Sequence, residues 1–328
     1  MQAFEYARPT TVQQAVKLLG ESKGDAQILA GGTDLISLMK DDVVKPRRIV
    51  SLSNVRELRA ITYAEGTGLR VGSLATLEEL MGNAHVRQHN PGIVQAAEGV
   101  TSPQIRSAGT VGGDLLQRPR CWYYRAGYGL LATYDGKPLV PEGDNRYHAI
   151  LGNSGPAYFV NPSSLAPILI ALGAKARIEG PSGKRELELA KFFTTPASDQ
   201  ENENALKPHE VLTEIVVPPA RGAKMAVYEV RQKEALDWPL AAAAVVLNLD
   251  DGNIKTARVV LGHVAPIPWV STEAEALLAG KSVNEELATE AGKTALSKAT
   301  PLSKNAYKVQ LARVAVKRAL LRAANGEA

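Results

Sequence analysis

Cysteine is nearly absent from this chain, since Cys121 is the only one among 328 residues. A single thiol excludes an internal disulfide framework and any all-cysteine metal site within the chain. Long apolar runs are missing too: the longest, residues 241–247, is strand-sized and far shorter than the roughly 20 residues that span a bilayer. The N-terminus, MQAFEYARPT, lacks the basic start and apolar centre of a secretory signal. We therefore expect a soluble, cytoplasmic protein without a membrane span.

The chain also lacks a large net charge, which is only +4. From Lys293 onward, however, eight basic residues stand against one acid, Glu327. Tyr307 is the single aromatic residue in this tail, whereas nucleic-acid-binding surfaces combine basic and aromatic side chains. We expect no nucleic acid partner, and both a solvated helix face and a protein-docking surface stay open.

Several catalytic motifs are missing. The sequence has no G-x-G-x-x-G after a strand, no G-x-x-x-x-G-K-[ST] loop and no G-x-S-x-G. These absences disfavour a nicotinamide-type Rossmann site, a P-loop ATPase and a serine hydrolase. The one helical i, i+4 histidine pair, His85 and His89, has no neighbouring acid to complete a metal site, so we expect solvated or capping roles for it.

Two glycine turns are the main chemical signal that the chain does contain. In the first, an apolar run ends in paired glycines and a Thr-Asp pair then opens a short helix; its residues are Ile28, Leu29, Ala30, Gly31, Gly32, Thr33, Asp34 and Leu35. A strand, a glycine turn and a helix start together present bare backbone N–H groups to an anion. The second turn, residues 109–115, repeats this chemistry about eighty positions later, and two such turns suit a ligand with two phosphates.

Two interpretations of these turns stay open from the residues alone. They are either tight turns that happen to use paired glycines, or the two sides of a pyrophosphate site with the Thr33 and Thr110 hydroxyls as further donors. Acids beside a phosphate would repel it. We therefore expect Asp34 to cap the helix start and Asp114 to accept hydrogen bonds from ligand hydroxyls, an arrangement that fits a dinucleotide carrying ribose or ribitol.

Apolar spacing and turn residues predict a mixture of strands and helices. Thr76 and Glu79 form a capping box, and residues 117–156 have the little periodicity of a functional insertion. Helices are predicted over residues 10–20, 35–39, 91–97, 163–172, 271–279, 284–298 and 304–324. In the last, Tyr307, Leu311, Val314 and Leu321 are expected to share the buried face. Strands are predicted over residues 28–30, 48–52, 61–63, 69–72, 158–160, 174–179, 185–189, 211–217, 223–232, 241–249 and 254–261.

The proline pair at 218–219 is the best candidate domain boundary. We expect a first subdomain over residues 1–53, a second over 54–219 that contains the insertion 117–156, and a C-terminal domain over 220–328. The overall class is α+β, and the C-terminal domain is expected to have a three-stranded sheet covered by helices.

Several motifs in order resemble the flavin-binding subunit of the xanthine dehydrogenase and carbon monoxide dehydrogenase family, the molybdenum hydroxylases. They are residues 29–35, Thr101-x-x-Gln104-Ile105-Arg106, residues 109–114, 161–167, 212–215, Lys233-x-x-x-Asp237 and 276–281. The resemblance covers nearly the whole chain. It implies an FAD-binding fold of the vanillyl-alcohol oxidase (PCMH) type, with two subdomains holding FAD between them, followed by a C-terminal α+β domain.

Within that family the chain is most similar to the flavin subunit of aldehyde oxidoreductases, on residues 117–125 and 143–150. Those relatives hold a [4Fe–4S] cluster in the corresponding insertion with four cysteines, and only Cys121 is present here. One thiolate cannot hold such a cluster. We therefore expect an insertion without its cluster, a structural or vestigial Cys121 and no metal. Ser164 stands where the family usually has an aspartate near the flavin, so it is not assigned as a ligand.

The resemblance also assigns site residues by position. Ile28 to Leu35 are expected on the pyrophosphate and adenosine side of FAD. The rest of the pyrophosphate, the ribitol and the ring would contact Thr101, Gly109, Thr110, Gly113 and Asp114. Leu212 and Lys233 would lie near the isoalloxazine or its approach.

The implied function is an electron-transfer subunit without a catalytic residue of its own. Substrate would be oxidised on a molybdopterin-binding large subunit, and a [2Fe–2S] small subunit would pass electrons to FAD and so to an external acceptor. Flavin suits this position because it accepts electrons singly and releases two together. The alternative is a self-contained flavin oxidoreductase of the same fold. The cytoplasm is the expected compartment, with the periplasm open if a partner carries the export signal.

Overall fold

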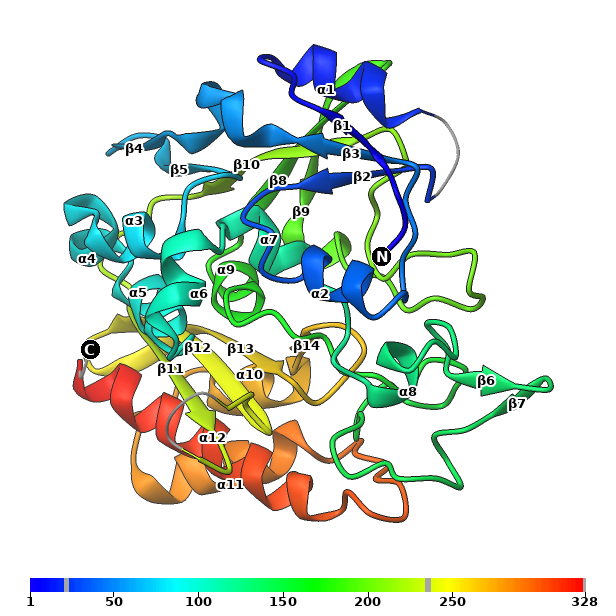
Figure 1. Ribbon diagram of the computed structural model, residues 1–328. Helices are drawn as coiled ribbons and strands as arrows, with labels where there is room; N and C mark the ends of the chain where they lie inside the picture. The colour runs from blue at the N-terminus through cyan, green and yellow to red at the C-terminus, as the bar shows by residue number, and fades with distance from the viewer. Residues whose placement is uncertain (21–23, 234–236, 327–328) are drawn as a thin grey trace.

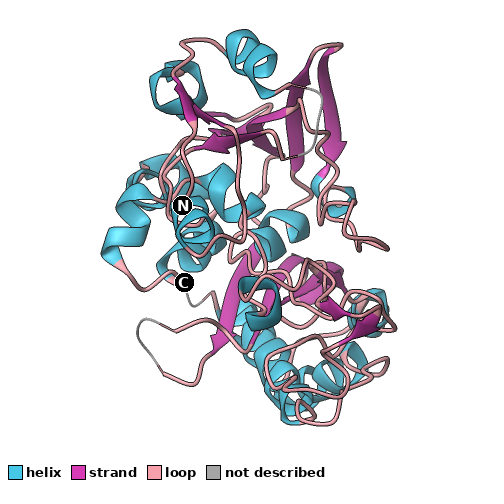
Figure 2. Ribbon diagram, turned by 45° about the vertical axis from the view of Figure 1, so that its right-hand side comes forward, coloured by secondary structure: helices cyan, strands magenta, loops and turns pink. Residues whose placement is uncertain are grey.

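The computed structural model describes residues 1–20, 24–233 and 237–326. Within these ranges the strands form a three-stranded, a five-stranded and a four-stranded sheet and one short hairpin. The first two sheets lie together at the top of Figure 1, and the third lies below them with the C-terminal helices. Helices from the middle of the chain separate the two levels, as Figure 2 also shows. The protein is thus layered, with the helices between sheets.

The three-stranded sheet is parallel, in the order β1 (Glu5–Ala7), β3 (Arg48–Ser51), β2 (Ala26–Leu29). Helix α1 (Val12–Leu19) begins where the Thr11 hydroxyl accepts a hydrogen bond from the Gln14 N–H. Its buried face, Val12, Ala15, Val16 and Leu19, packs with Val50 and Leu52. This small core fixes the end of β2, from which the first glycine turn departs into α2 (Leu35–Lys40).

The five-stranded sheet is antiparallel throughout, and its strands come from both sides of the insertion. Its order is β4 (Ile61–Ala64), β5 (Gly68–Gly72), β10 (Val211–Val217), β8 (Lys175–Gly180), β9 (Gly183–Glu188). The strands predicted over residues 61–63 and 69–72, and over 174–179 and 185–189, pair as two hairpins, β4–β5 and β8–β9. Strand β10 lies at the centre of this sheet and pairs with β5 and β8. It therefore joins the strands that precede the insertion to those that follow it.

Short helices cover this sheet and reach the C-terminal one. They are α3 (Leu77–Gly82), α4 (Ala84–His89), α5 (Pro91–Glu98), α6 (Pro103–Ala108), α7 (Val111–Leu116) and α9 (Ala166–Ala171). The capping box is present at α3, with the Glu79 N–H donating to the Thr76 hydroxyl at 3.1 Å. Helix α7 contacts β5 and β10, whereas α5 contacts β11 (Lys224–Val230). These helices join the two levels.

The insertion contains more regular secondary structure than its sequence suggests. It contains α8 (Trp122–Arg125) and the hairpin of β6 (Thr133–Tyr134) and β7 (Lys137–Pro138). Residues 158–160, predicted as a strand, are not one. The Ala149 N–H bonds the Tyr158 carbonyl at 2.9 Å and the Asn161 N–H bonds the Ala265 carbonyl at 2.9 Å, so isolated contacts replace a ladder there.

The C-terminal sheet has four strands where three were predicted, in the order β11, β12 (Ala241–Asp250), β13 (Asn253–Gly262), β14 (Trp269–Val270). Beside it lie α10 (Thr272–Leu278), α11 (Glu285–Ala295) and α12 (Tyr307–Asn325). The two-residue β14 escaped prediction because so short a strand has no periodicity. Within the described residues no helix is long and apolar enough to cross a membrane.

The predicted buried stripe of α12 is wrong. Tyr307 is 41% exposed, whereas the buried residues are Lys308, Ala312, Ala315, Val316, Ala319, Leu320 and Ala323. Alanines on the helix lie against the alanine-rich strand β12, and these small side chains allow a close approach. The larger Leu311 and Leu321 flank the contact and are only partly buried.

Candidate functional site

The first glycine turn packs backbone against backbone with the second motif. Gly32 has a φ of +74°, which favours glycine, and a Cβ on Gly31 would lie 1.8 Å from the Ala108 carbonyl oxygen. No other residue fits so close an approach. The structure therefore brings together two turns that lie far apart in the sequence.

The backbone N–H groups of Gly31, Gly32, Thr33 and Asp34 donate to no acceptor in the described part of the chain. All four residues line one pocket. Consecutive N–H groups without a protein acceptor form a concave, partly positive surface that suits phosphate oxygens.

The second motif behaves differently from the prediction. It begins helix α7, with Thr110 as the N-cap, and the N–H groups of Gly109 and of residues 111–114 already have partners. Gly112 donates to the Ser73 carbonyl at 2.8 Å and Gly113 to the Thr110 hydroxyl at 3.0 Å, and Asp114 donates to the Thr110 carbonyl at 2.8 Å. This motif therefore supplies a wall and a close contact, not a second set of unpaired N–H groups.

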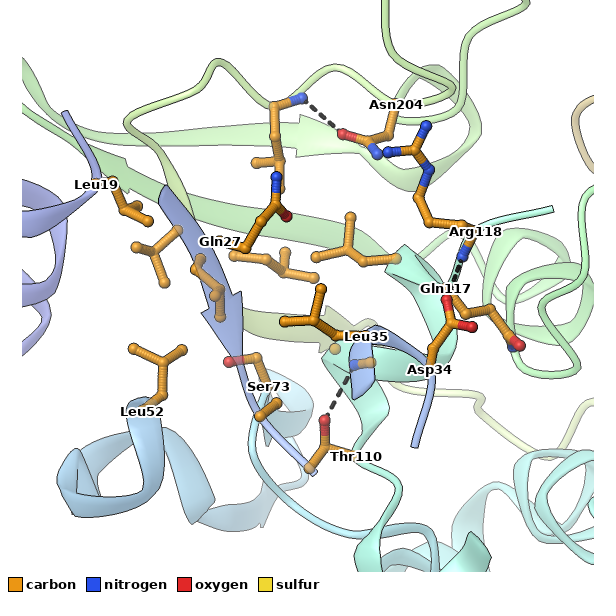
Figure 3. Close-up of a pocket in the computed structure, with 18 of the residues that line it drawn as sticks. Leu19, Gln27, Asp34, Leu35, Leu52, Ser73, Thr110, Gln117, Arg118 and Asn204 are labelled. Carbon is orange, nitrogen blue, oxygen red and sulfur yellow. Dashed lines mark hydrogen bonds between the residues drawn. The ribbon is translucent and has the colours of Figure 1, made fainter. Parts of the chain in front are cut away.

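Two adjoining pockets, of about 250 and 280 Å³, meet at the turns. Thr33, Asp34, Thr110, Gly113 and Gln117 line both, so the two form one extended trough. Figure 3 shows the first pocket, with Leu35, Thr110 and Ser73 on one side and Arg118 and Asn204 on the other. An elongated trough with unpaired N–H groups near its middle suits a long ligand with a central pyrophosphate.

Asp34 is not the helix cap that the sequence predicts. It stands at the N-cap position of α2, but its side chain makes no capping hydrogen bond. Instead its carboxylate accepts from the Arg118 N–H at 2.8 Å, from the Arg125 guanidinium at 2.8 Å and from Arg120. Burial by itself raises the pKa of Asp34, but the positive charges of Arg120 and Arg125 outweigh it and hold the pKa below its ordinary value. The carboxylate therefore stays ionised and neutralised by the insertion.

The side chains of two of these insertion arginines, Arg118 and Arg120, also form part of the trough walls. The Arg118 side chain forms an ion pair with buried Glu203 at 2.5 Å, and both residues line the first pocket. The Arg120 guanidinium lies 4.5 Å from the ring centroid of Trp238, and both residues line the second pocket. The insertion therefore contributes directly to the candidate site.

Asp114 is buried and its carboxylate is engaged by the protein. It accepts from the Ser163 hydroxyl at 2.5 Å, the Leu165 N–H at 3.0 Å and the Ser164 N–H at 3.3 Å. Burial raises the pKa of Asp114 despite these bonds. The predicted role as acceptor for ligand hydroxyls thus competes with a structural role, which is to hold residues 163–165 against the second pocket.

The remaining predicted residues do not all line the same pocket. Thr101 and Gly109 line the second pocket, and Ile28, Ala30 and Leu35 line the first. Leu212 also lines the first pocket, from strand β10. Leu29 lies behind the turn, where a Cβ on Gly32 would come within 3.3 Å of its side chain. Lys233 is exposed and lines neither pocket, so the structure does not place it with Leu212.

Several lining residues escaped the sequence analysis as site residues. Ser73, Leu74, Glu203, Trp238 and the insertion residues Gln117, Arg118 and Arg120 belong to this group. Three arginines near the start of the insertion, at positions 118, 120 and 125, are close together in the sequence, but nothing local indicates that they meet Asp34. Ser164 was left unassigned, and it lines the second pocket.

Cys121 lies beside a histidine and not in a metal cluster. Its Sγ is 3.1 Å from His148 Nε2. Across the described residues, no group of three or more His, Cys, Asp or Glu side chains is placed to hold a metal ion. His85 and His89 instead stack with Tyr63, with ring centroids 5.5 and 4.0 Å away.

Comparison with known families agrees with this geometry. The FAD binding domain in molybdopterin dehydrogenase matches residues 2–220, and the CO dehydrogenase flavoprotein C-terminal domain matches residues 226–323. Together these two models span most of the chain, and the first alone matches more than half of it.

Individual relatives match over nearly their full length. The aldehyde oxidoreductase FAD-binding subunit PaoB of Escherichia coli (strain K12) is 30% identical over 316 residues, which are 95% of this chain and 96% of PaoB. The carbon monoxide dehydrogenase medium chain of Hydrogenophaga pseudoflava is 30% identical over 322 residues, covering 97% and 96%. A solved structure of carbon monoxide dehydrogenase from that organism matches with a TM-score of 0.78 at 29% identity, covering 100% of this chain and 99% of the other. The chain therefore belongs to the FAD-binding subunits of the molybdopterin dehydrogenase (molybdenum hydroxylase) family, as an oxidoreductase subunit whose cofactor is FAD.

Proposed function

We propose that FAD lies along the trough between subdomains 1–53 and 54–219, with its pyrophosphate at the N–H groups of Gly31 to Asp34. The observation that carries this proposal is the set of four consecutive backbone N–H groups without a protein acceptor at the junction of two pockets. This donor set fits a pyrophosphate. Ile28 and Leu35 then border the adenosine side, and Thr101, Gly109, Thr110, Gly113 and Asp114 border the ribitol and ring. Leu212, which the resemblance implies near the ring, lines the same pocket as Ile28, so we propose it on the adenosine side instead.

The neighbouring residues prepare this site for an anion. Because Arg120 and Arg125 neutralise Asp34, its carboxylate does not repel phosphate at the adjacent turn. The contact between Gly31 and the Ala108 carbonyl holds the turn against α6, so the N–H groups keep one orientation without the ligand. Asp114 keeps Ser163 to Leu165 in place at the opposite wall. Lys233, exposed in the loop after β11, would contact only the approach to the ring.

We further propose that the chain is the electron-transfer subunit of a complex. A [2Fe–2S] subunit delivers electrons, FAD passes them to an external acceptor, and substrate is oxidised on a molybdopterin-binding large subunit. When bound, FAD supplies the conversion between one-electron and two-electron transfer. The support is the match to medium and FAD-binding subunits over 95% of the chain or more.

The test is a purification of the native complex followed by cofactor analysis. We expect flavin absorbance bands that follow this chain, with molybdopterin and iron in separate subunits. A fully assembled complex in which this chain is colourless would refute the proposal. Substrate-dependent bleaching of flavin by the isolated chain would instead support a self-contained oxidoreductase.

The proposal that this chain holds no [4Fe–4S] cluster can be tested by spectroscopy. One thiol next to His148 offers too few ligands, so electrons have to reach FAD directly from the [2Fe–2S] partner. Mössbauer and EPR spectra of the complex are expected to show only [2Fe–2S] signals. A [4Fe–4S] signal assigned to this chain would contradict the proposal.

The cellular location of the chain and its lack of a nucleic acid partner are also proposals. We propose a cytoplasmic location, tested by cell fractionation, with a periplasmic one if a partner carries the export signal. We propose no nucleic acid partner, because the basic tail is largely engaged: Lys317 pairs with Glu285 at 2.8 Å, and Arg318 and Arg322 lie over the Tyr228 ring. Salt-sensitive binding to duplex DNA would refute the latter.

A further inference from the structure

A third pocket, of about 200 Å³, adjoins the trough and has no role in the function proposed above. It shares Arg120, Asp237 and Trp238 with the second pocket. Aromatic side chains, Trp122, Tyr147, Phe159 and Trp238, form much of its lining. A cavity of about 150 Å³ is enough to bind benzene, so this pocket has room for one or two fused rings.

Its wall contains two buried histidines and three charged residues, Arg120, Asp237 and Lys308, of which Arg120 is paired with Asp34. His148 and His263 are each 3% exposed. Burial, with the nearby charge of Lys308, lowers the pKa of His148 to about 4 and that of His263 to about 3, so both rings are neutral at pH 7. His263 Nε2 has no hydrogen-bond partner among the described residues. A buried nitrogen without a partner is destabilising, and a ligand oxygen or hydroxyl would relieve it.

The wall around these histidines is held in place by the protein itself. The Lys308 ammonium is buried and donates to the carbonyls of Tyr147, His148 and His263, at 2.9 to 3.2 Å. Burial lowers the pKa of Lys308 to about 7, and its N–H groups are directed at these carbonyls. His263 also has a φ of +61°, a conformation that costs energy for a residue with a side chain and that is enriched at functional sites.

We propose that this pocket binds a neutral, planar aromatic molecule of one or two fused rings that carries a hydroxyl or carbonyl oxygen. The aromatic lining provides apolar contact and ring stacking, and His263 Nε2 provides a hydrogen bond to the polar group. The histidines of the wall are uncharged, Lys308 already donates to backbone carbonyls and Arg120 is already paired with Asp34, whereas Asp237 would repel an anion. An anion therefore leaves water without gaining a free positive partner and binds more weakly.

The test is calorimetric titration of the full chain, saturated with FAD so that the trough is filled, with 1-naphthol and with 1-naphthoate. These probes share a ring system and differ in charge. We expect saturable 1-naphthol binding with a dissociation constant below about 1 mM and at least roughly tenfold weaker binding of 1-naphthoate. Absence of saturable 1-naphthol binding, or equal affinity for both probes, would overturn the proposal, and neither outcome requires a variant.

Variants then locate the site. His263→Phe keeps a ring and removes Nε2, and we expect it to weaken 1-naphthol binding about fivefold. Leu240→Trp fills the pocket and is expected to abolish binding. His85→Phe, on exposed helix α4, is the matched control and keeps wild-type affinity. Unchanged affinity in the Leu240→Trp variant would refute this location. A chain that takes up no FAD but still binds 1-naphthol would refute the FAD proposal and leave this one intact.

Discussion

The Arg125 guanidinium donates a hydrogen bond to Asp34 Oδ1 at 2.8 Å, and this contact joins the insertion to the first glycine turn. Both side chains are largely buried, with 18% and 15% of their surfaces exposed. Arg120 binds the same oxygen, and the Arg118 N–H binds the other one. The insertion thus forms part of the trough wall in a chain with only one cysteine.

Replacing Asp34 by Asn should weaken the contact between the insertion and the first glycine turn. The variant keeps an oxygen for the Arg118 N–H but leaves Arg120 and Arg125 buried beside each other without a counter-charge, which costs about 3 kcal/mol of unfolding free energy. Urea unfolding measures it, and flavin content should fall as well. Asp42→Asn is the control, since Asp42 pairs with the N-terminal amine at an exposed site and its loss should change stability far less. Equal losses in both variants would contradict the prediction.

Gly31→Ala should separate the two glycine motifs. The added Cβ would lie 1.8 Å from the Ala108 carbonyl oxygen, a backbone atom that cannot rotate away. We expect most bound flavin to be lost, measured as the flavin-to-protein absorbance ratio. Gly66→Ala, in the β4–β5 turn, is the control because its Cβ would meet nothing within 4 Å. Normal flavin content in Gly31→Ala would count against the site.

Gly32→Asp tests the same turn by charge. The residue has a φ of +74°, and the new carboxylate would stand beside N–H groups that we assign to phosphate. The variant should be purified without flavin, whereas Gly32→Ala carries the backbone strain and a Cβ contact of 2.8 Å with Ile36 but no charge, and should lose less. Full flavin content in Gly32→Asp would refute the pyrophosphate assignment.

Stability should fall as the pH drops from about 6.5 toward 4. The pKa of His148 is lowered to about 4 and that of His263 to about 3, first by burial and then by the charge of Lys308. In the unfolded chain both titrate near pH 6.5, so in this window the unfolded state binds protons that the folded state does not. Acid therefore favours unfolding, by up to about 1.4 kcal/mol per pH unit for each histidine.

The measurement is the urea midpoint between pH 7 and pH 4.5. His148→Gln and His263→Gln should each flatten the decline, although each also lowers stability at pH 7. His85→Gln, on an exposed helix face, should keep the wild-type slope. An unchanged slope in all three variants would show that other groups cause the decline.

The Cys121 thiol should react slowly in the folded chain. Burial raises its pKa, more than the Tyr123 and Tyr124 N–H groups lower it, so little thiolate is present at neutral pH. We expect iodoacetamide labelling at pH 7.5 to be at least roughly tenfold slower than in urea. Cys121→Ser should keep its flavin. Loss of iron from the complex on this substitution would reveal a cluster ligand.

Much of the fold could be predicted because its signals are local. Thr76 and Glu79 are three positions apart and cap α3 as predicted. The Lys175–Gly180 and Gly183–Glu188 hairpin follows from its alternation and its Pro-Ser-Gly turn. Prediction failed for α12, where large apolar residues indicated the wrong face. The helix lies close to an alanine-rich strand, and only tertiary contact selects alanines as its buried face.

The sequence by itself determined the family, the glycine turn at 28–35 and the lack of cluster ligands, since these depend on residue types in order. The tertiary structure decided which of the two glycine motifs keeps unpaired N–H groups. It also decided that the Asp34 carboxylate accepts hydrogen bonds from the insertion arginines and does not cap a helix. The partners of Asp34 lie 84, 86 and 91 positions away in the sequence. Whether a buried donor or acceptor is free depends on groups that only folding brings within about 3 Å, and no local pattern encodes that distance.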